Sequence, residues 1–439
     1  MDVTVPEVLT FVKENDVKFI RLAFCDMFGN LKNISVMPEE LPRAFETGIS
    51  FDASAVRGFL NAEESDLFLV PDAATLSVLP WRPSHGRVVR LFCDIRRPGG
   101  QPFEGDMRHF LRMAAERIQK LGYHPSIGSE CEFYLFQTDE NGDPTTIPQD
   151  HAGYCDVAPL DRGENVRREI CLTLEEMGIR PESSHHEQGP GQNEIAFRYD
   201  DAVTAADNLI TFKNVVKSVA SRNGLFASFL PKPVSGKSGS GLHVNLSLFR
   251  NGQNLFRSGS SEHSREAESF LMGILSRVKE MTAFLNPLTN SYRRFGVCEA
   301  PRYLTWSHQN RSQLIRIPAA TGDYSRMELR SPDPSCNPYL AFGLLLLAGL
   351  EGIEKGLPLC PPTNRNLFLD PPGEEEGISA LPGSLEEALD QAEASAFIRS
   401  ALPEEPLSKY LAAKREECEA ARSSGNALLY EENAWFPVV

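Results

Sequence analysis

The stretch IGSECEFYLFQ (residues 127–137) is typical of a β-strand that carries two acidic side chains on one face. Successive side chains of a strand point to opposite faces, so Glu130 and Glu132 share one side and apolar residues share the other. Buried charges need partners or metal ions. The acidic side of this strand therefore does not form part of a dry core.

Two further segments, LHVNLSLF (residues 242–249) and SRMELRS (residues 325–331), repeat this pattern. The polar residues that share one face are His243, Asn245 and Ser247 in the first segment and Arg326, Glu328 and Arg330 in the second. A solvated sheet face with ion pairs explains any one of these strands taken alone. Three such strands in one chain favour a single face that binds metal ions and anions.

The loop SSHHEQGPGQNEIAF (residues 183–197) adds two carboxylates, Glu187 and Glu194, on either side of a Gly-Pro-Gly turn. A turn this tight can bring both back to one place. The predicted ligands are Glu130, Glu132, Glu187, Glu194, His243 and Glu328. Oxygen ligands with one imidazole suit Mg²⁺ or Mn²⁺, and six ligands are enough for two ions. His185 and His186 are expected to be structural, because adjacent side chains diverge.

Five arginines follow within a short stretch of the chain, at positions 294, 311, 316, 326 and 330. Arginine is suited to two-pronged binding of carboxylate and phosphate. Arginines combined with two metal ions indicate phosphoryl transfer, in which positioning and charge neutralisation dominate. The sequence has no GxxxxGK[ST] loop and no kinase motif, so ATP would be held by another fold.

The composition narrows the function further. The 439 residues include 44 Lys and Arg against 60 Asp and Glu, a net charge of −16 that argues against nucleic-acid or membrane partners. Nine scattered cysteines without a CxxC pair indicate reduced thiols in a cytoplasmic protein. No secretory signal is recognisable, and the longest apolar run, residues 339–350, is short enough to be a buried helix.

The chain is expected to form two domains. Residues 1–95 look like a small unit with a helix at 6–15 and strands at 17–25, 31–36 and 88–95. RRPGGQPFEGD (residues 96–106) is rich in Gly and Pro and marks the boundary, which we place between residues 102 and 103. Asp106 is predicted to cap a helix ending near residue 121, and a helical tail is predicted over residues 385–422.

Taken in order, these motifs resemble those of type I glutamine synthetases. The shared landmarks include FDASAVRGF (51–59), SECEF (129–133), GYCDVAP (153–159), SHHEQGPGQNE (184–194), GSGLHVNLS (239–247), NSYRR (290–294), IRIP (315–318) and MELRS (327–331). The resemblance implies an α+β fold, with a small N-terminal β-grasp-like domain over residues 1–102. Residues 103–439 would form a catalytic domain whose antiparallel half-barrel sheet is flanked by helices.

The resemblance also implies a role for each site residue. One metal ion would be held by Glu132, Glu187 and Glu194, and the other by Glu130, His243 and Glu328. Glutamate and ammonium would be bound by Tyr154, Glu187, Gly239, Arg294, Arg311 and Arg330. The nucleotide would be bound by Tyr199, His243, Ser247, Arg316 and Arg326. Asp52, Glu299 and Arg311 would be catalytic, with Asp52 as the base and Glu299 on a flap.

The implied reaction joins ammonia to the γ-carboxylate of glutamate through γ-glutamyl phosphate, at the expense of ATP. The implied assembly is a dodecamer of two hexameric rings, with active sites between subunits. Three departures from the family pattern, Ala53 and Ala55 in the Asp52 loop and a flap one residue short between Arg294 and Glu299, keep open an organic amine such as methylamine, ethanolamine or a polyamine as nucleophile. A non-catalytic structural or regulatory relative is the remaining alternative. The unusual C-terminal ending, NAWFPVV, leaves the ring stacking open.

Overall fold

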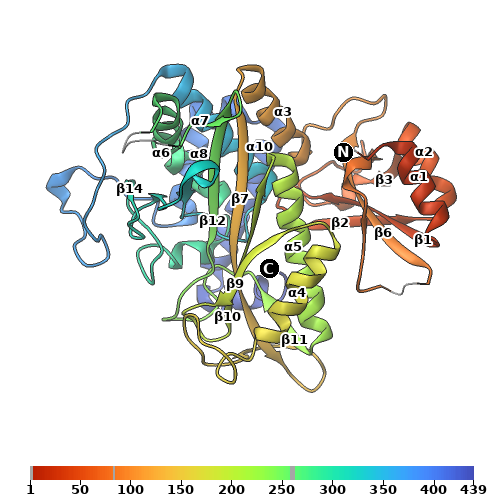
Figure 1. Ribbon diagram of the computed structural model, residues 1–439, viewed down its shortest axis with the longest axis horizontal. Helices are drawn as coiled ribbons and strands as arrows, with labels where there is room; N and C mark the ends of the chain where they lie inside the picture. Colours follow the sequence, from red (N-terminus) through yellow and green to blue (C-terminus); the bar gives the residue numbers. More distant parts are fainter. Residues whose placement is uncertain (1–2, 83–84, 258–262) are drawn as a thin grey trace.

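The computed structural model describes residues 3–82, 85–257 and 263–439, and it contains two β-sheets. The N-terminal sheet has the order β2-β1-β6-β4-β3, with β5 (Ser77–Val78) on β6. The other strands are β1 (Val17–Cys25), β2 (Leu31–Val36), β3 (Ile49–Asp52), β4 (Asp66–Pro71) and β6 (Arg87–Arg96). Strands β1 and β6 are parallel and the remaining pairs are antiparallel, as in a β-grasp domain. Helices α1 (Val5–Glu14) and α2 (Leu41–Thr47) belong to this unit (Figure 1).

The two units meet at Arg108, on the first turn of α3 (Met107–Lys120). Asp106 caps this helix as predicted, accepting hydrogen bonds from the amides of residues 108 and 109. The buried Arg108 guanidinium donates to Asp72 and Asp94 of the N-terminal unit, both at 2.9 Å, and to Asp207 at 2.8 Å. A buried arginine shared by three carboxylates ties the N-terminal unit to α5 (Ala202–Arg222), which contains Asp207, because each lost partner would leave a buried charge uncompensated.

The larger sheet has ten strands in the order β14-β15-β16-β12-β7-β10-β9, with β8, β11 and β13 attached outside this path. Its strands are β7 (His124–Thr138), β8 (Pro144–Pro148), β9 (Pro181–His186), β10 (Gln192–Asp200), β11 (Leu225–Ser228), β12 (Leu242–Arg250), β13 (Gln253–Asn254), β14 (Trp306–His308), β15 (Ile315–Ile317) and β16 (Met327–Leu329). All pairs except β14–β15 are antiparallel. The curled sheet is the half-barrel that the sequence predicts.

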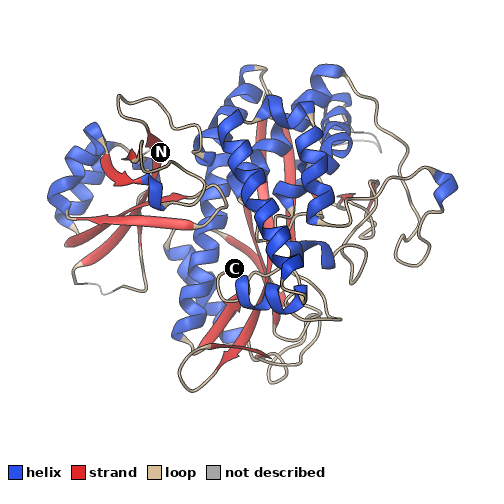
Figure 2. Ribbon diagram, turned by 180° about the vertical axis from the view of Figure 1, so that it is seen from behind, coloured by secondary structure: helices blue, strands red, loops and turns tan. Residues whose placement is uncertain are grey.

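Helices cover one side of this sheet (Figure 2). Helices α3 and α5 (Ala202–Arg222) contact β7, and α7 (Pro338–Lys355) packs against α3, α5 and α6 (Arg265–Leu285). Helix α4 (Glu164–Glu176) contacts α5 and β9. The apolar residues of β7 and β12, Cys131, Phe133, Val244 and Leu246 among them, are fully buried in the core that these helices share. The opposite face of the sheet is left to the polar residues.

Most predicted elements are confirmed, and two differ in extent. The strand predicted over residues 325–331 is shorter in the structure, where β16 spans Met327–Leu329. It ends there because the next residue, Arg330, donates its N–H to Leu314 O, outside the hydrogen-bond ladder of the sheet. The predicted helical tail is confirmed as three consecutive helices, α8 (Leu385–Ala394), α9 (Ala396–Ala401) and α10 (Glu404–Ser423), and α11 (Ala427–Ala434) continues it beyond residue 422. Ser395 caps α9 and Pro403 precedes α10, so local chemistry ends each helix. None of the helices in the described ranges is long and apolar enough to cross a membrane.

The last residues of the sequence pack on the larger sheet. Phe436 packs edge-on against Phe136, with ring centroids 5.0 Å apart, in a small cluster that includes Tyr134. The last residue, Val439, accepts a hydrogen bond from Phe229 N–H. The C-terminal segment therefore forms part of the support of β7 and β11.

Candidate active site

The register of the large sheet places the predicted ligands side by side on one face. Glu194 on β10 lies directly opposite Glu132 on β7, and His243 on β12 lies opposite Glu130. Glu328 on β16 continues the row across β12. Directly opposed residues of antiparallel strands have Cβ atoms about 4.5–5.5 Å apart. Residues distant in sequence therefore form one row through strand pairing.

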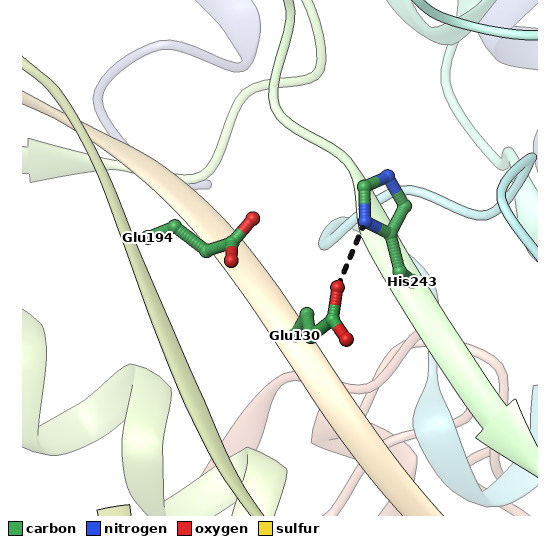
Figure 3. A group of neighbouring side chains, drawn as sticks. All are labelled: Glu130, Glu194 and His243. Carbon is green, nitrogen blue, oxygen red and sulfur yellow. Dashed lines mark hydrogen bonds and ion pairs between the residues drawn. The ribbon is translucent and has the colours of Figure 1, made fainter. Parts of the chain in front are cut away.

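Glu130, Glu194 and His243 form a group whose ligand atoms all lie within 4.8 Å of one another. Figure 3 shows the three side chains pointing toward one another from β7, β10 and β12, with 3.4 Å between Glu130 Oε2 and His243 Nδ1. His185, Glu187 and Glu194 form a second group of the same compactness. Glu194 belongs to both groups, so the two candidate cation positions are adjacent.

The two remaining predicted ligands have partners of their own. Glu132 Oε2 accepts from Gly241 N–H at 2.8 Å and from the Gln192 amide at 3.0 Å, which leaves Oε1 facing His243 at 3.9 Å. Glu328 accepts from Arg316 at 2.5 Å and from Arg330 at 3.0 Å. The compact groups thus divide the carboxylates differently from the assignment implied by the resemblance.

Electrostatics distinguishes Glu194 on β10 from Glu130 on β7. Burial, followed by the charges of Glu132, Glu130 and Glu187, raises the pKa of Glu194 far above its usual range. Burial acts in the same direction on the pKa of Glu130, but the hydrogen bond and charge of His243 more than offset it and hold this pKa at about 2. Carboxylates crowded in this way repel one another unless a cation lies between them.

The donor set fits divalent cations. Carboxylate oxygens predominate, imidazole nitrogens are available, and the acids oppose one another in register. Oxygen-rich sets with an occasional imidazole suit Mg²⁺ and Mn²⁺. Such ions would be held by Glu130, Glu132, Glu187, Glu194 and His243, with Glu328 close by.

The two adjacent histidines diverge as expected, but the structural role predicted for both describes His186 alone. His186 is fully buried, and its Nε2 lies 2.9 Å from Asp150 Oδ1. His185 instead points to the site, with Nε2 2.9 Å from Glu187 Oε1 and 4.0 Å from Glu194. Asp150, Asp161 and His186 are also close enough to hold an ion, yet Asp161 is paired with Arg167 at 2.5 Å.

A cavity of about 240 Å³ opens beside the acidic row. It is lined by Glu132, Tyr154, Glu187, Gln188, Gln192, Glu194, Ser238, Gly239, His243, Arg294, Cys298, Glu299, Ala300, Arg311 and Arg330. Tyr154, Glu187, Gly239, Arg294, Arg311 and Arg330, predicted to bind glutamate or ammonium, are all among them, whereas Asp52, which the resemblance also implies for the ammonium pocket, is not. The cavity therefore joins the metal-ligand face to the arginine cluster.

The arginines of this cavity are positioned by main-chain oxygens. Arg294 is fully buried and donates to Ser331 O at 2.7 Å and to Arg330 O at 3.0 Å. Burial lowers the pKa of Arg294, although the charge of Glu132 acts in the opposite direction. Arg330 donates to Glu299 O and to Arg311 O, which links it to the loops on both sides of the cavity.

Gly239 has no room for a side chain. A Cβ at this position would lie 2.4 Å from Pro231 O and 3.1 Å from Arg294 Cγ. Gln192 donates to Gly239 O at 3.2 Å, and Tyr134 donates to Ser238 O at 2.5 Å. The main chain can therefore approach a bound molecule closely here, as the prediction for Gly239 requires.

A second, smaller pocket of about 40 Å³ lies on the other side of Glu130. Its lining includes the predicted nucleotide residues Tyr199, Ser247 and Arg326, together with Tyr324. Arg326 donates to Asn245 at 2.8 Å, and its guanidinium lies 3.9 Å from Glu130. Glu130 lines this pocket and not the larger one, so the row of ligands separates the two spaces.

The predicted flap residue lies in a strained loop. Cys298 and Glu299 adopt positive φ angles of 48° and 63°, which non-glycine residues rarely do. Both are exposed, and both line the cavity. Tyr154 is also on an exposed loop, with its ring 5.3 Å from that of His185.

Asp52 does not lie at the cavity of its own chain. It ends β3 in the N-terminal sheet, is exposed, and accepts hydrogen bonds from Ser54. The hydrogen bonds from the Ser54 hydroxyl and amide lower its pKa. Among the described residues that line the 240 Å³ cavity, none belongs to the N-terminal unit.

Several residues of the site escaped prediction. His185 was assigned elsewhere, and Gln188, Gln192 and Tyr324 were assigned no role. A signal for Gln192 exists in the sequence, because it shares a strand face with Glu194 two positions later. Tyr324 lies on a short 3-10 turn, η5 (Gly322–Tyr324), which has no periodicity to reveal its direction.

Comparisons with known proteins agree with this arrangement. The family model described as the catalytic domain of glutamine synthetase matches residues 104–431, and that of the glutamine synthetase β-grasp domain matches residues 16–98. A glutamine synthetase of Clostridium saccharobutylicum is 48% identical over 425 residues, covering 96% of both proteins. One of Methanosarcina mazei is 49% identical over 419 residues, covering 94% of both.

Solved structures give the same result. The chain of a GmaS/ADP complex is 31% identical, with a TM-score of 0.86 over 97% of this chain and 98% of that one. Plasmodium falciparum glutamine synthetase is 27% identical, with a TM-score of 0.85 over 98% of both chains. These matches span both sheets. The chain therefore belongs to the glutamine synthetase family and is a ligase of that type, a family that uses ATP and divalent metal ions.

Proposed function

We propose that the protein joins ammonia to the γ-carboxylate of L-glutamate through γ-glutamyl phosphate, with ATP as co-substrate and Mg²⁺ or Mn²⁺ as the metal. The observation that carries this proposal is the 240 Å³ cavity, in which a row of carboxylates faces Arg294, Arg311 and Arg330. Divalent ions held by the row would neutralise phosphate charge, and the arginines would hold carboxylate and phosphoryl oxygens.

Glutamate is proposed to occupy the cavity beside Gly239, whose bare backbone allows close approach. Its γ-carboxylate oxygen attacks the γ-phosphorus of ATP, and ADP leaves. Arg311 and Arg330 would stabilise the negative charge that develops on the transferred phosphoryl group. The ATP phosphates are assigned to Arg316 and Arg326, and the adenine to the 40 Å³ pocket beside Tyr199. The structurally similar GmaS chain was solved with ADP.

Ammonium is assigned to Tyr154 and Glu187, which line the same cavity. A base must remove one proton before nitrogen attacks the acyl phosphate and releases phosphate. Asp52 is the proposed base, although it lies on the N-terminal sheet, outside the cavity of its own chain. In a homo-oligomer, Asp52 of one chain would complete the cavity of a neighbouring chain. This arrangement accounts both for the role of Asp52 as base and for its position outside the cavity of its own chain. We propose a dodecamer of two hexameric rings, working in the cytoplasm.

Glu299 is proposed to close over the intermediate. Its loop is exposed, and positive φ angles at Cys298 and Glu299 keep it away from the commonest backbone conformations. Closure would exclude water, which otherwise hydrolyses an acyl phosphate.

An organic amine remains the second candidate nucleophile. Ala55 lacks a hydroxyl in the Asp52 loop, and the chain is similar in structure to GmaS as well as to glutamine synthetases. Two observations favour ammonia. The curated relatives named glutamine synthetase are closer in sequence, at 48–49% identity against 31%. Tyr154 and Glu187 also both line the cavity.

The test is ADP release by the purified protein with glutamate, ATP and Mg²⁺ or Mn²⁺. Ammonium is compared with methylamine, ethanolamine, putrescine and spermidine, and each product is identified by mass. Glutamine formed with the highest kcat/KM for ammonium supports the proposal. Preference for an organic amine would make the protein a γ-glutamyl-amine ligase, and no metal-dependent ADP release would identify a non-catalytic relative.

A further inference from the structure

A cavity of about 560 Å³ lies between the two domains, away from the site described above. The N-terminal sheet contributes residues of β1, β2 and β6, and the catalytic domain contributes α5 and the last two residues of the chain. It shares no lining residue with the 240 Å³ cavity. We call it the interdomain basic cavity, defined by Arg21, Lys32, Arg90, Lys213 and Lys217.

The charge of this cavity is opposite to that of the protein. Five basic side chains line it, whereas none of the described residues that line it has an acidic side chain. The whole chain has 60 acidic residues against 44 Lys and Arg, so the basic lining of this cavity runs against the overall composition. Val439 is also part of the lining.

Three of the five cations are held by neutral groups. Arg90 donates to Thr211 Oγ1 at 2.5 Å and stacks 4.1 Å from the Phe92 ring, while its buried Nε has no hydrogen-bond partner. Lys213 donates to Pro334 O at 2.7 Å, and Lys217 donates to Val438 O at 2.8 Å. The hydrogen bonds of these three cations are thus made to neutral groups, although the charge of Asp207 also acts on Arg90.

The other two cations differ in their surroundings. Lys32 lies 4.0 Å from Asp26, at the limit of an ion pair. Burial, and then the nearby charge of Arg82, lowers the pKa of Arg21.

The surroundings also act on Lys217, one of the three cations held by neutral groups. Burial, followed by the charge of Lys213, lowers the pKa of Lys217 to about 7. Cations whose protonated forms are disfavoured by their surroundings gain most from a bound anion.

We propose that the interdomain basic cavity binds a small polyvalent oxyanion, a phosphorylated or polycarboxylate metabolite. Its volume falls within the roughly 300–1,000 Å³ of small-molecule sites. Arginines suit two-pronged oxyanion binding, and the aromatic rings of Phe28 and Trp81 on the wall leave room for an organic part. This inference goes beyond the proposed reaction.

An anion bound in the interdomain basic cavity would connect the two domains. Arg21, Lys32 and Arg90 belong to the N-terminal sheet, and Lys213 and Lys217 belong to α5 of the catalytic domain. An anion bound between them adds attraction across the interface in addition to the Arg108 contacts. Because Asp52 is on the same N-terminal sheet, the anion is suited to regulate the enzyme; this step rests on the proposed function.

The experiment is isothermal titration calorimetry on the full chain, in EDTA and at constant ionic strength. Pyrophosphate and citrate are the two probes, and they distinguish phosphate from carboxylate chemistry. We expect one site per chain for at least one probe, weakened about tenfold in Arg21→Gln, in line with loss of one charge-assisted contact. Lys32→Gln is a second variant at an exposed position, should Arg21→Gln fold poorly.

Arg311→Gln is the matched control, because it removes an arginine from the proposed active site and leaves the interdomain basic cavity intact. Binding that survives in Arg311→Gln and weakens in Arg21→Gln supports the proposal. Absence of binding, or binding lost in Arg311→Gln alone, overturns it. Since no metal, glutamate or turnover is involved, the result is independent of which reaction the enzyme catalyses.

Discussion

Glu132 on β7 and Glu194 on β10 occupy directly opposed positions of neighbouring strands, on the face that lines the 240 Å³ cavity. Like charges in this arrangement destabilise a sheet. Burial, followed by the charges of neighbouring carboxylates, raises the pKa of Glu194 far above its usual range, and burial also raises the pKa of Glu132. The sheet therefore carries a local cost that a bound cation would remove, so metal binding and fold stability are coupled.

Metal ions should stabilise the protein through this pair. Adding Mg²⁺ or Mn²⁺ is expected to raise Tm, with a gain of about 2.7 kcal/mol at a concentration 100 times Kd. Glu194→Gln should lose most of this gain, because Glu194 belongs to both compact ligand groups. Differential scanning fluorimetry with and without EDTA measures the effect. Glu354→Gln, at a surface pair with Arg117, is the control; equal metal responses in the two variants would contradict the assignment.

Substitutions of Asp52 and of Glu328 should block the proposed reaction at different steps. Glu328→Ala is expected to abolish ADP release, because Glu328 lies between His243 and two arginines of the phosphoryl-transfer region. Asp52→Ala should retain glutamate-dependent ADP release and lose amide formation. Quantifying ADP and glutamine in the same reactions separates the two outcomes, and equal loss of ADP in both variants would contradict the division of roles.

The same two variants test the shared active site. When Asp52→Ala and Glu328→Ala subunits are dissociated, mixed and reassembled, amide formation should partly return. Random mixing places an intact Asp52 of one chain beside an intact Glu328 of another at a fraction of the sites. Each variant reassembled alone is the control. No recovery in mixed oligomers would place Asp52 in its own chain's site or remove it from the reaction.

The last helix should influence glutamate binding through Glu431. This buried carboxylate accepts from Arg293 Nε at 2.7 Å and from the Asn290 amide at 3.0 Å, next to the substrate residue Arg294. Glu431→Ala is expected to raise KM for glutamate about tenfold, equivalent to about 1.4 kcal/mol, with a smaller change for ATP. Glu431→Gln should recover part of the loss, since its oxygen still accepts. The exposed neighbour Glu432→Ala serves as control, and equal shifts in both KM values would indicate general destabilisation.

The Asp150–His186 pair predicts a pH-dependent stability. Burial lowers the pKa of His186, but the Asp150 hydrogen bond and charge more than offset this and raise it above 6.5. Its contribution is therefore complete below pH 6.5 and is lost as pH rises through the folded-state pKa. The pKa of Asp150 is about 2, since hydrogen bonds from His186 and two amides outweigh burial. The Asp150 contribution is lost as pH falls from 3.8 toward 2.

Asp150→Asn should accordingly lose more stability at pH 5 than at pH 9. At pH 5 the cost is about 1–3 kcal/mol, the range for a buried group that loses a hydrogen-bond partner. Thermal unfolding across this range measures the difference. Asp139→Asn, on an exposed turn, is the control. A loss independent of pH would mean that the charge of His186 does not contribute.

Strand periodicity predicted most of the site, because a residue's face depends on its own strand alone. Glu130, Glu132, His243 and Glu328 were therefore placed correctly on one face before the pairing of their strands was known. The direction of a side chain in a loop depends on distant contacts. His185 was missed because strand β9 continues to residue 186, which places His185 directly opposite Glu194 and on the same face of the sheet.

The helical tail shows a second limit of the sequence. Amphipathic patterns indicate helix over residues 385–422 as a whole, whereas the breaks depend on single caps, such as Ser395. The docking of Phe436 against Phe136 joins segments 300 positions apart, and no local pattern contains that information.

Residues that face the cavity alternate along β7 with residues that face the core. One strand register therefore determines both the position of the ligand residues and the packing of the core. Deleting a single residue ahead of Glu130 would turn Glu130 and Glu132 toward the helices and expose Cys131 and Phe133 at the cavity. Such a deletion would disrupt the packed core and the ligand face of the sheet together, so no intermediate form could survive selection. Lineages of this fold should therefore accumulate insertions and deletions in connections such as residues 139–143, while the central strands keep a constant length.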